Sequence, residues 1–307
     1  MSVTTRGAVY GLAAGAIWGA MYIISDVVLK TIPPFTLLTI RLLLGAGVLA
    51  FISWRSPNLR RPTRREILQL LGVGIVGFGI SVGSQFVGTD KSTGVNGALV
   101  TSASPAFILV FAALILREKL TLQRLAAVIL ATIGVMVIVD LSKADFSSAT
   151  FWGDMALALA AVMWGLYSVL VRVVSARLDT LTVSLYAFMG GLIITVPAAA
   201  LELQDRSIGT IDGGTILGIL YLGIVSTAVA MWLWNRAFAL VDASVASLFF
   251  FAQPLVGAVL GVLLGQPFTP NLWIGGLLIA FGVLLSMVSV EWLNRRASKT
   301  PVQSAET

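Results

Sequence analysis

The chain of 307 residues consists of long apolar runs separated by short polar segments. Five runs carry no charged residue and cover 7–25, 67–89, 92–116, 180–201 and 213–235. The run 35–54 contains Arg41 as its single charge, and the stretches 122–141 and 151–171 are shorter or carry an acid near one end. Because about 20 apolar residues suffice to cross a bilayer as a helix, each run predicts a transmembrane helix.

The last apolar run, 243–290, is too long for one crossing. Its middle, 265–271, contains Gly265, Pro267 and Pro270, which break a helix. We therefore expect two further helices here. The total is ten, which places both termini on the same face of the membrane.

The chain contains an internal repeat of about 147 residues. A shift of 146 residues superposes Trp18-Gly19 on Trp164-Gly165 and Gly45 on Gly191, and a shift of 149 superposes Gly74-Ile75-Val76 on Gly223-Ile224-Val225 and Pro105 on Pro254. Each copy has five predicted helices, an odd number, so the second copy enters the membrane from the opposite face. Such inverted repeats are typical of carriers whose two halves rock against each other.

The amino-acid composition excludes several classes of function. The chain is 58% apolar and 11% charged, whereas about 25% is charged in an ordinary soluble protein, so a soluble enzyme is excluded. It contains no Cys and no His, which excludes thiolate chemistry, His-dependent hydrolases and most metalloenzymes. An intramembrane hydrolase is disfavoured as well, because no pair of carboxylates falls at mid-membrane depth. We expect no enzyme activity, no cofactor and no metal.

The formal net charge of +6 reflects membrane topology. With ten helices, the loops on the face of the termini hold fifteen of the 20 Lys and Arg residues and the opposite loops hold four. Cationic loops stay in the cytoplasm, so both termini are predicted to be cytoplasmic. No basic stretch is interleaved with stacking aromatic residues, which argues against nucleic acid. The first run is longer than a signal-peptide core and recurs in the second copy, so we expect it to be retained.

These landmarks make the chain resemble the ten-helix EamA-type carriers of the drug/metabolite transporter superfamily. The marks are the two Trp-Gly pairs, Arg41, Pro105, Pro254 and the segment Arg117-Glu118-Lys119-Leu120-Thr121. The resemblance implies an all-α integral membrane fold of ten transmembrane helices in two inverted five-helix repeats, 7–141 and 151–292, followed by a cytoplasmic tail, 293–307. It also implies a central cavity lined by the first, third and fourth helices of each half. Where the family repeats its acidic residue in the second half, this chain has Gln266.

Polar and aromatic residues in those helices are the candidates for substrate binding. They are Trp18, Tyr22, Ser81, Gln85, Thr101, Ser104, Trp164, Ser168, Thr227, Trp234, Asn235, Phe250 and Gln253. Polar groups are costly in hydrocarbon unless paired, and paired prolines in equivalent helices indicate a substrate site. The alternative for each polar or aromatic residue is packing against, or pairing with, a neighbouring helix. Packing alone is likewise the alternative for Pro105 and Pro254.

Two charged residues and two groups of glycines give further predictions. Arg41 is predicted to serve structure or gating, with carboxylate binding and extension to the membrane interface as alternatives. Glu118 is either a gating residue or part of a solvated ion pair at a helix end. Two stripes of glycines at a spacing of four, one at Gly11, Gly15 and Gly19 and the other at 257, 261 and 265, predict close helix packing within a monomer, with a homodimer face as the alternative.

The sequence thus predicts an alternating-access transporter in a bacterial inner membrane that exports a small zwitterionic metabolite. The resemblance is greatest to the amino-acid exporter branch, including carriers of aromatic amino acids. Carriers of cationic compounds or sugars are the alternative, and a channel is disfavoured because no filter-like repeat is visible. Since no acid falls at the membrane centre, we expect transport without a titrating side chain at that depth.

Overall fold

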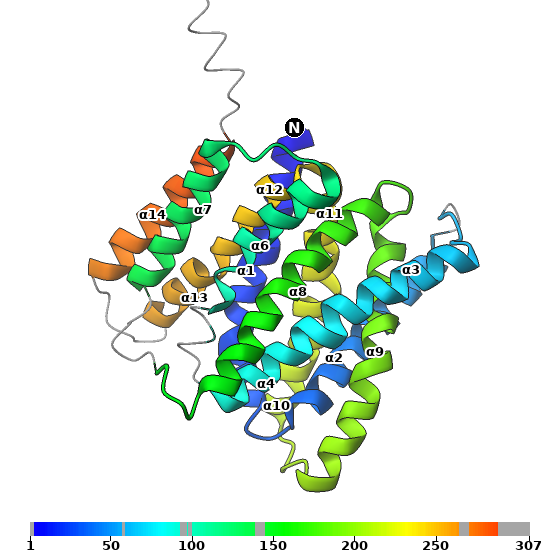
Figure 1. Cartoon of the computed structure of the whole chain (residues 1–307). Helices are drawn as coiled ribbons and strands as arrows, with labels where there is room; N and C mark the ends of the chain where they lie inside the picture. Colours follow the sequence, from blue (N-terminus) through cyan, green and yellow to red (C-terminus); the bar gives the residue numbers. More distant parts are fainter. Residues whose placement is uncertain are drawn as a thin grey trace, which may run out of the picture.

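The structure, a computed structural model, describes residues 3–56, 59–92, 97, 100–138, 145–263 and 270–287, and this part of the chain is helical without strands (Figure 1). The first half contains α1 (Val3–Val28), α2 (Pro34–Trp54), the continuous run of α3 (Arg64–Gly74), η1 (Ile75–Val82) and α4 (Gly83–Lys91), then α6 (Ser104–Phe111) with η2 (Ala112–Leu116), and α7 (Leu122–Ile138). Five apolar spans therefore make up this half.

The second half repeats this order. It contains α8 (Phe151–Ser175), α9 (Thr180–Asp205), the continuous run of α10 (Gly213–Leu220), η4 (Tyr221–Val229) and α11 (Ala230–Leu240), then α12 (Ala243–Ala246), η5 (Ser247–Phe251) and α13 (Ala252–Leu263), and α14 (Pro270–Met287). The described residues thus form ten helical spans, and five of these helices are individually long and apolar enough to cross a membrane. The all-α membrane fold predicted from the sequence is confirmed.

The contacts between helices repeat when the two halves are exchanged. Helix α1 packs against α11 and α13, and its counterpart α8 packs against α4 and α6. Likewise, α9 packs against α3 and η1, and its counterpart α2 packs against η4. The equivalent helices α2 and α9 also pack against each other, and so do α7 and α14. In Figure 1, α1 runs away from the N-terminus and α8 runs toward it. The helices are therefore related as an inverted repeat, with most contacts made between the halves rather than within them.

The molecule has two ends, which we name from the chain. The N-terminal face is where α1 begins and α2 ends; the far face is where α1 ends and α2 begins. The tail 293–307, the turn at 264–269 and Gln266 lie outside the described residues.

Pro105 and Pro254 both lie at the start of a helix rather than in its middle. Pro105 lies in the first turn of α6, directly after a turn at Ser102 and Ala103. Pro254 lies in the first turn of α13, after the 3-10 helix η5. A proline in a first turn breaks no hydrogen bond, because that amide has no partner within the helix. The prolines therefore start new helix segments rather than kink the middle of one.

The third span of each half contains a long π-helical segment, η1 and η4, at overlapping positions of the repeat. Wide turns of this kind are rare and frequently lie at functional sites. They shift the register of the backbone hydrogen bonds, so that carbonyl oxygens face neighbouring side chains. Two such carbonyls matter for the site below.

Glycines permit the closest contacts between the halves. A Cβ at Gly15 would lie 2.7 Å from the Phe249 carbonyl oxygen, and one at Gly19 would lie 2.8 Å from that of Gln253. The stripe on α1 therefore packs against η5 and α13 of the other half, as the prediction of packing within the monomer requires. In the equivalent place, a Cβ at Gly165 would lie 2.7 Å from Cβ of Phe107.

Candidate functional site

A cavity of about 510 Å³ lies between the two halves. Its inner end is formed by Trp18, Trp164 and Phe250, and it extends along α1 and α4 to Leu29 and Thr89 near the far face. A second hollow of about 530 Å³ shares Leu29, Phe86 and Thr89 with it and is otherwise lined by loop residues of the far face. The cavity therefore opens at the far face.

Three tryptophans close the cavity toward the N-terminal face. The ring centroids of Trp18 and Trp164, which are equivalent in the repeat, lie 5.7 Å apart in an edge-to-face arrangement. The ring of Trp234 lies 5.3 Å from Trp18 and 6.2 Å from Trp164, on the side away from the cavity. Such ring pairs are stabilising beyond the area that they bury. The cluster forms a rigid aromatic floor.

Eleven of the seventeen residues singled out from the sequence line this cavity. They are Trp18, Arg41, Ser81, Gln85, Thr101, Ser104, Trp164, Thr227, Phe250, Gln253 and Pro254. The first and third spans of each half contribute, and so do the segments next to both helix breaks. Residues near Pro105 are small and hydroxylated whereas those near Pro254 are aromatic, so the two walls differ as the sequence indicates.

Several hydroxyl groups in the lining already have partners in the backbone. Ser81 donates to the carbonyl oxygen of Ala160 across the two halves at 2.8 Å. Thr101 donates to Gly97 and Thr227 to Leu222, each at 2.6 Å. The Thr227 bond reaches back five residues, which the π-helical turn of η4 allows. These hydroxyls can still accept a hydrogen bond from a ligand.

Arg41 is buried, with 5% of its surface exposed, and lines the cavity. Its Nε donates to the Thr227 hydroxyl at 3.2 Å, and its Nη2 lies 3.2 Å from Sδ of Met21 and 3.5 Å from the Ser226 hydroxyl. The alternative in which Arg41 extends to the membrane interface is therefore wrong. The side chain of Asp26, its suggested gating partner, lies outside the described residues.

Three of the proposed substrate-binding residues do not line the cavity, and neither does Pro105. Ser168, Trp234 and Asn235 are fully buried behind the aromatic floor. Ser168 donates to the Trp164 carbonyl of its own helix, while Asn235 accepts from the Tyr167 hydroxyl at 3.1 Å and donates to Ser184 at 2.9 Å. Asn235 is therefore satisfied by neighbouring helices and Ser168 by its own helix, whereas Nε1 of Trp234 is buried without a hydrogen-bond partner among the described residues. The side chain of Tyr22 lies outside the described residues.

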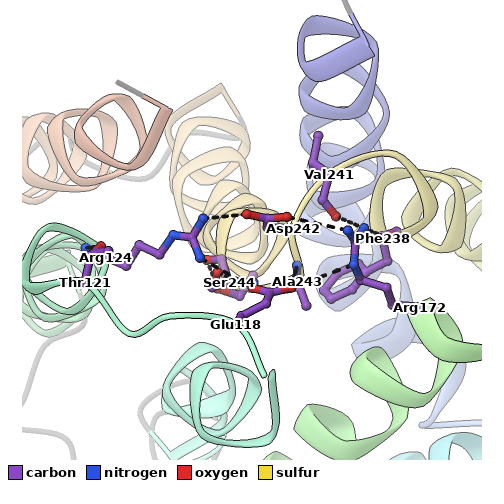
Figure 2. Close-up of polar contacts among 10 residues, drawn as sticks. Glu118, Thr121, Arg124, Arg172, Phe238, Val241, Asp242, Ala243 and Ser244 are labelled. Carbon is purple, nitrogen blue, oxygen red and sulfur yellow. Dashed lines mark hydrogen bonds and ion pairs between the residues drawn. The ribbon is translucent and has the colours of Figure 1, made fainter. Parts of the chain in front are cut away.

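Glu118 lies outside the cavity, in an ionic cluster at the N-terminal face that we call the clasp (Figure 2). The clasp comprises Glu118, Arg124, Arg172, Asp242 and Ser244. The Glu118 carboxylate accepts from the amides of Ala243 at 2.8 Å and Ser244 at 3.2 Å, and from the Ser244 hydroxyl. A residue of the first half thus holds the first turn of the ninth span, which belongs to the second half.

Two arginines complete the clasp. Arg124 lies 3.5 Å from Glu118 and 2.6 Å from Asp242; Arg172 lies 3.7 Å from Glu118 and 3.5 Å from Asp242. Arg172 also donates to the carbonyl oxygens of Phe238 and Val241. The Glu118 side chain is 11% exposed, so its pairing is shielded from water. Sequence reasoning treated both arginines only as topological charges, because nothing in their spacing shows that four helix ends converge here.

At the far face, an exposed ion pair and a carboxylate link the two halves. Arg206 and Asp90 form an exposed bidentate pair at 3.1 and 2.7 Å, and the hydrogen bond to Asp90 raises the pKa of the Arg206 guanidinium. Glu202 accepts from the amides of Phe35 and Thr36 at the start of α2. Exposed ion pairs of this kind contribute little. The part-buried Glu202 carboxylate, by contrast, also accepts from the Thr36 hydroxyl and so holds the start of α2 as Glu118 holds the start of the ninth span.

The model of the EamA-like transporter family matches residues 5–140 and 151–288, and so covers both halves of the bundle. The chain belongs to the EamA-like transporter family. It is therefore a multi-pass membrane protein of a transporter family, and that membership points to a non-enzymatic transporter role. The two Trp-Gly pairs, which carry part of the resemblance, lie at contacts between the halves.

Relatives named as transporters are similar to this chain over most of its length. An uncharacterized transporter of Archaeoglobus fulgidus is 28% identical, with 88% of this chain and 93% of the relative aligned. The uncharacterized inner membrane transporter YicL of Salmonella typhimurium is also 28% identical, over 93% and 96% of the two chains. A crystal structure of a protein 22% identical superposes with a TM-score of 0.80 and covers 95% of this chain and 99% of that chain, which supports the fold.

Proposed function

We propose that this transporter is an alternating-access carrier of a bacterial inner membrane that exports amino acids, including those with aromatic side chains. The observation that carries the proposal is the cavity between the halves, which combines a buried guanidinium, small hydroxyls and aromatic walls. A free amino acid offers a carboxylate, an ammonium group and an apolar side chain. The cavity has groups that match each of the three.

Arg41 supports the choice of a carboxylate ligand. Among the described lining residues it is the one with a formal charge, and a guanidinium binds carboxylates in a planar, charge-assisted geometry. A cationic compound would meet like charge there. The hydroxyls of Ser104 and Thr101 and the Gln253 amide offer acceptors for an ammonium group.

The inverted repeat supports alternating access, and so does the difference between the contacts at the two faces. The cavity opens at the far face while the clasp and the aromatic floor close the N-terminal face. If the excess of cations places the termini in the cytoplasm, this state faces outward. Export then requires a second state, in which the clasp is open and the far face is closed, with the ligand bound between the halves.

Uptake into proteoliposomes tests this function. Vesicles preloaded with unlabelled L-phenylalanine should accumulate labelled L-phenylalanine by counterflow, without a pH or sodium gradient, and the flux should saturate. Labelled glucose and a cationic dye serve as comparison solutes. Counterflow of the dye or the sugar without that of amino acids would contradict the amino-acid assignment, and single-channel currents would contradict a carrier.

A further inference from the structure

The tryptophans Trp18 and Trp164 are equivalent in the repeat but not in their hydrogen bonds. Nε1 of Trp18 donates to the Ser226 carbonyl oxygen at 3.0 Å. Nε1 of Trp164 is buried and has no hydrogen-bond partner among the described residues; the same holds for Nε1 of Trp234, but of these two indoles it is that of Trp164 that lines the cavity. A buried N–H without a partner is costly and rare in native structures. The same side chain, in the same place of the repeat, is thus satisfied in one half only.

The acceptor of the Trp18 bond belongs to the π-helical segment η4. Its counterpart in the repeat is Gly77 in η1, by the shift of 149 residues that superposes Gly74 on Gly223. The backbone of Gly77 already lies against the helix of Trp164, since a Cβ there would come within 2.2 Å of the Tyr167 ring. The first half therefore offers Trp164 the carbonyl that the second half offers Trp18.

Alternating access in inverted-repeat carriers is largely a rocking of one half against the other, and we take the second state to be the one in which the two halves have exchanged conformations. Every contact between the halves is then replaced by its counterpart. The bond from Trp18 to Ser226 becomes a bond from Trp164 to Gly77, and Trp18 loses its partner.

We propose that the two indoles exchange roles during transport, and that the one without a protein partner donates its N–H to the ligand. In the state with the open far face Trp164 is this donor, and in the opposite state Trp18 is. The ligand would meet a tryptophan N–H in both states, while the other tryptophan stabilises the closed arrangement. This inference rests on the proposed carrier function and names the donor of its site.

The chain offers a direct reporter because it contains no cysteine. Val171 is fully buried in this structure, whereas its counterpart by the shift of 146 residues, Ser25, lines the cavity with 8% of its surface exposed. A cysteine in the variant Val171→Cys should therefore react with a methanethiosulfonate reagent only in the opposite state. The variant Ser25→Cys reports on the present state. Both are measured in lipid nanodiscs, where both faces are accessible, without any ligand.

Each indole bond stabilises one state, so removing the N–H should shift the populations in opposite directions. Trp18→Phe should raise the modification rate of Val171→Cys about three- to tenfold, and Trp164→Phe should lower it by a similar factor, the effect of one hydrogen bond. The double variant should return close to the original rate. Trp152→Phe, at an exposed tryptophan, is the matched control and should leave the rate unchanged.

Shifts in the same direction, or changes below twofold in both single variants, would overturn the exchange. Reactivity of Ser25→Cys in each background shows that the variant is folded. In a second experiment, L-phenylalanine should slow the modification of the cysteine in Ser25→Cys. The concentration of L-phenylalanine that halves this modification rate should rise about three- to tenfold when Trp164→Phe is added. If L-phenylalanine protects no variant, the amino-acid assignment fails, and the ligand-free rates alone decide the inference.

Discussion

At the scale of single residues, Arg41 illustrates how burial gives a charge its role. A guanidinium in the membrane interior is tolerated where it faces a cavity or a polar partner, and Arg41 has both. Because only 5% of the surface of Arg41 is exposed, bulk water would weaken its interaction with a ligand carboxylate little. Arg41 is therefore the residue whose replacement should change ligand preference most.

We expect Arg41→Gln to raise KM for L-phenylalanine about 10- to 100-fold, because one charge-assisted contact contributes about 1.5–3 kcal/mol. KM for L-phenylalaninamide, which lacks the carboxylate, should change less than threefold. Both values come from initial rates of uptake into proteoliposomes. Arg65→Gln, at an exposed arginine of α3, is the control. An equal loss for acid and amide would show that Arg41 supports the fold rather than the carboxylate.

How far the sequence predicts the site also depends on single residues. Trp18, Trp164 and both prolines were found because they recur in the repeat, and a recurring landmark needs no knowledge of side-chain contacts. Trp234 and Asn235 were misplaced, since a polar or aromatic residue on a helix gives no sign of which neighbour satisfies it. Arg172 and Asp242 were missed as site residues, because ion pairs between distant loops depend on helix ends that only the folded bundle brings together.

At the scale of helices, glycine positions set how closely the halves approach. A Cβ at Gly74 would lie 1.9 Å from the Ala187 carbonyl oxygen of α9, and one at Gly190 would lie 2.2 Å from that of Leu71 on α3. The two helices thus meet backbone to backbone, which is how membrane helices gain packing energy without a hydrophobic driving force. The contact is reciprocal and leaves no room for a methyl group on either side.

Gly74→Ala should therefore lower stability by about 1–3 kcal/mol, the usual cost of overpacking. Gly72→Ala, two residues earlier on the same helix, meets nothing within 4 Å and should leave stability unchanged or raise it slightly. The melting temperatures of the purified variants in one detergent provide the comparison. Equal melting temperatures would contradict the close contact between α3 and α9.

The order of the ten helical spans could be predicted from the apolar runs. The division of single spans into α-helical, π-helical and 3-10 segments could not. The runs 67–89 and 213–235 give no hint of η1 or η4, because π-helical turns depend on packing rather than on composition. Prolines 105 and 254 do predict a break, yet their sequence position alone cannot distinguish a kink from a new helix start. The difference matters, since a new start places the residues just before each proline in the cavity wall.

At the scale of the whole molecule, the two faces are closed by different chemistry. The exchange of halves replaces the floor residue Trp234 by Gln85 and Asn235 by Phe86, and both of these counterparts line the open cavity. It also replaces Glu118 by a residue near Gln266, which is uncharged. The sequence therefore has no carboxylate at the repeat position of Glu118. This asymmetry makes the clasp a determinant of which state is populated.

Glu118→Gln should consequently favour the opposite state. The change removes the charge that binds Arg124 and Arg172 and weakens the hold on the amides of Ala243 and Ser244. Hydrogen bonds to a charged, largely buried group contribute about 1.5–3 kcal/mol, so the modification rate of Val171→Cys should rise about tenfold or more. Asp90→Asn breaks the exposed pair with Arg206 on the other face and should change that rate less than twofold. Equal effects of the two variants would mean that the clasp is an ordinary surface ion pair, and a lower rate in Glu118→Gln would reverse the assignment of the face that it closes.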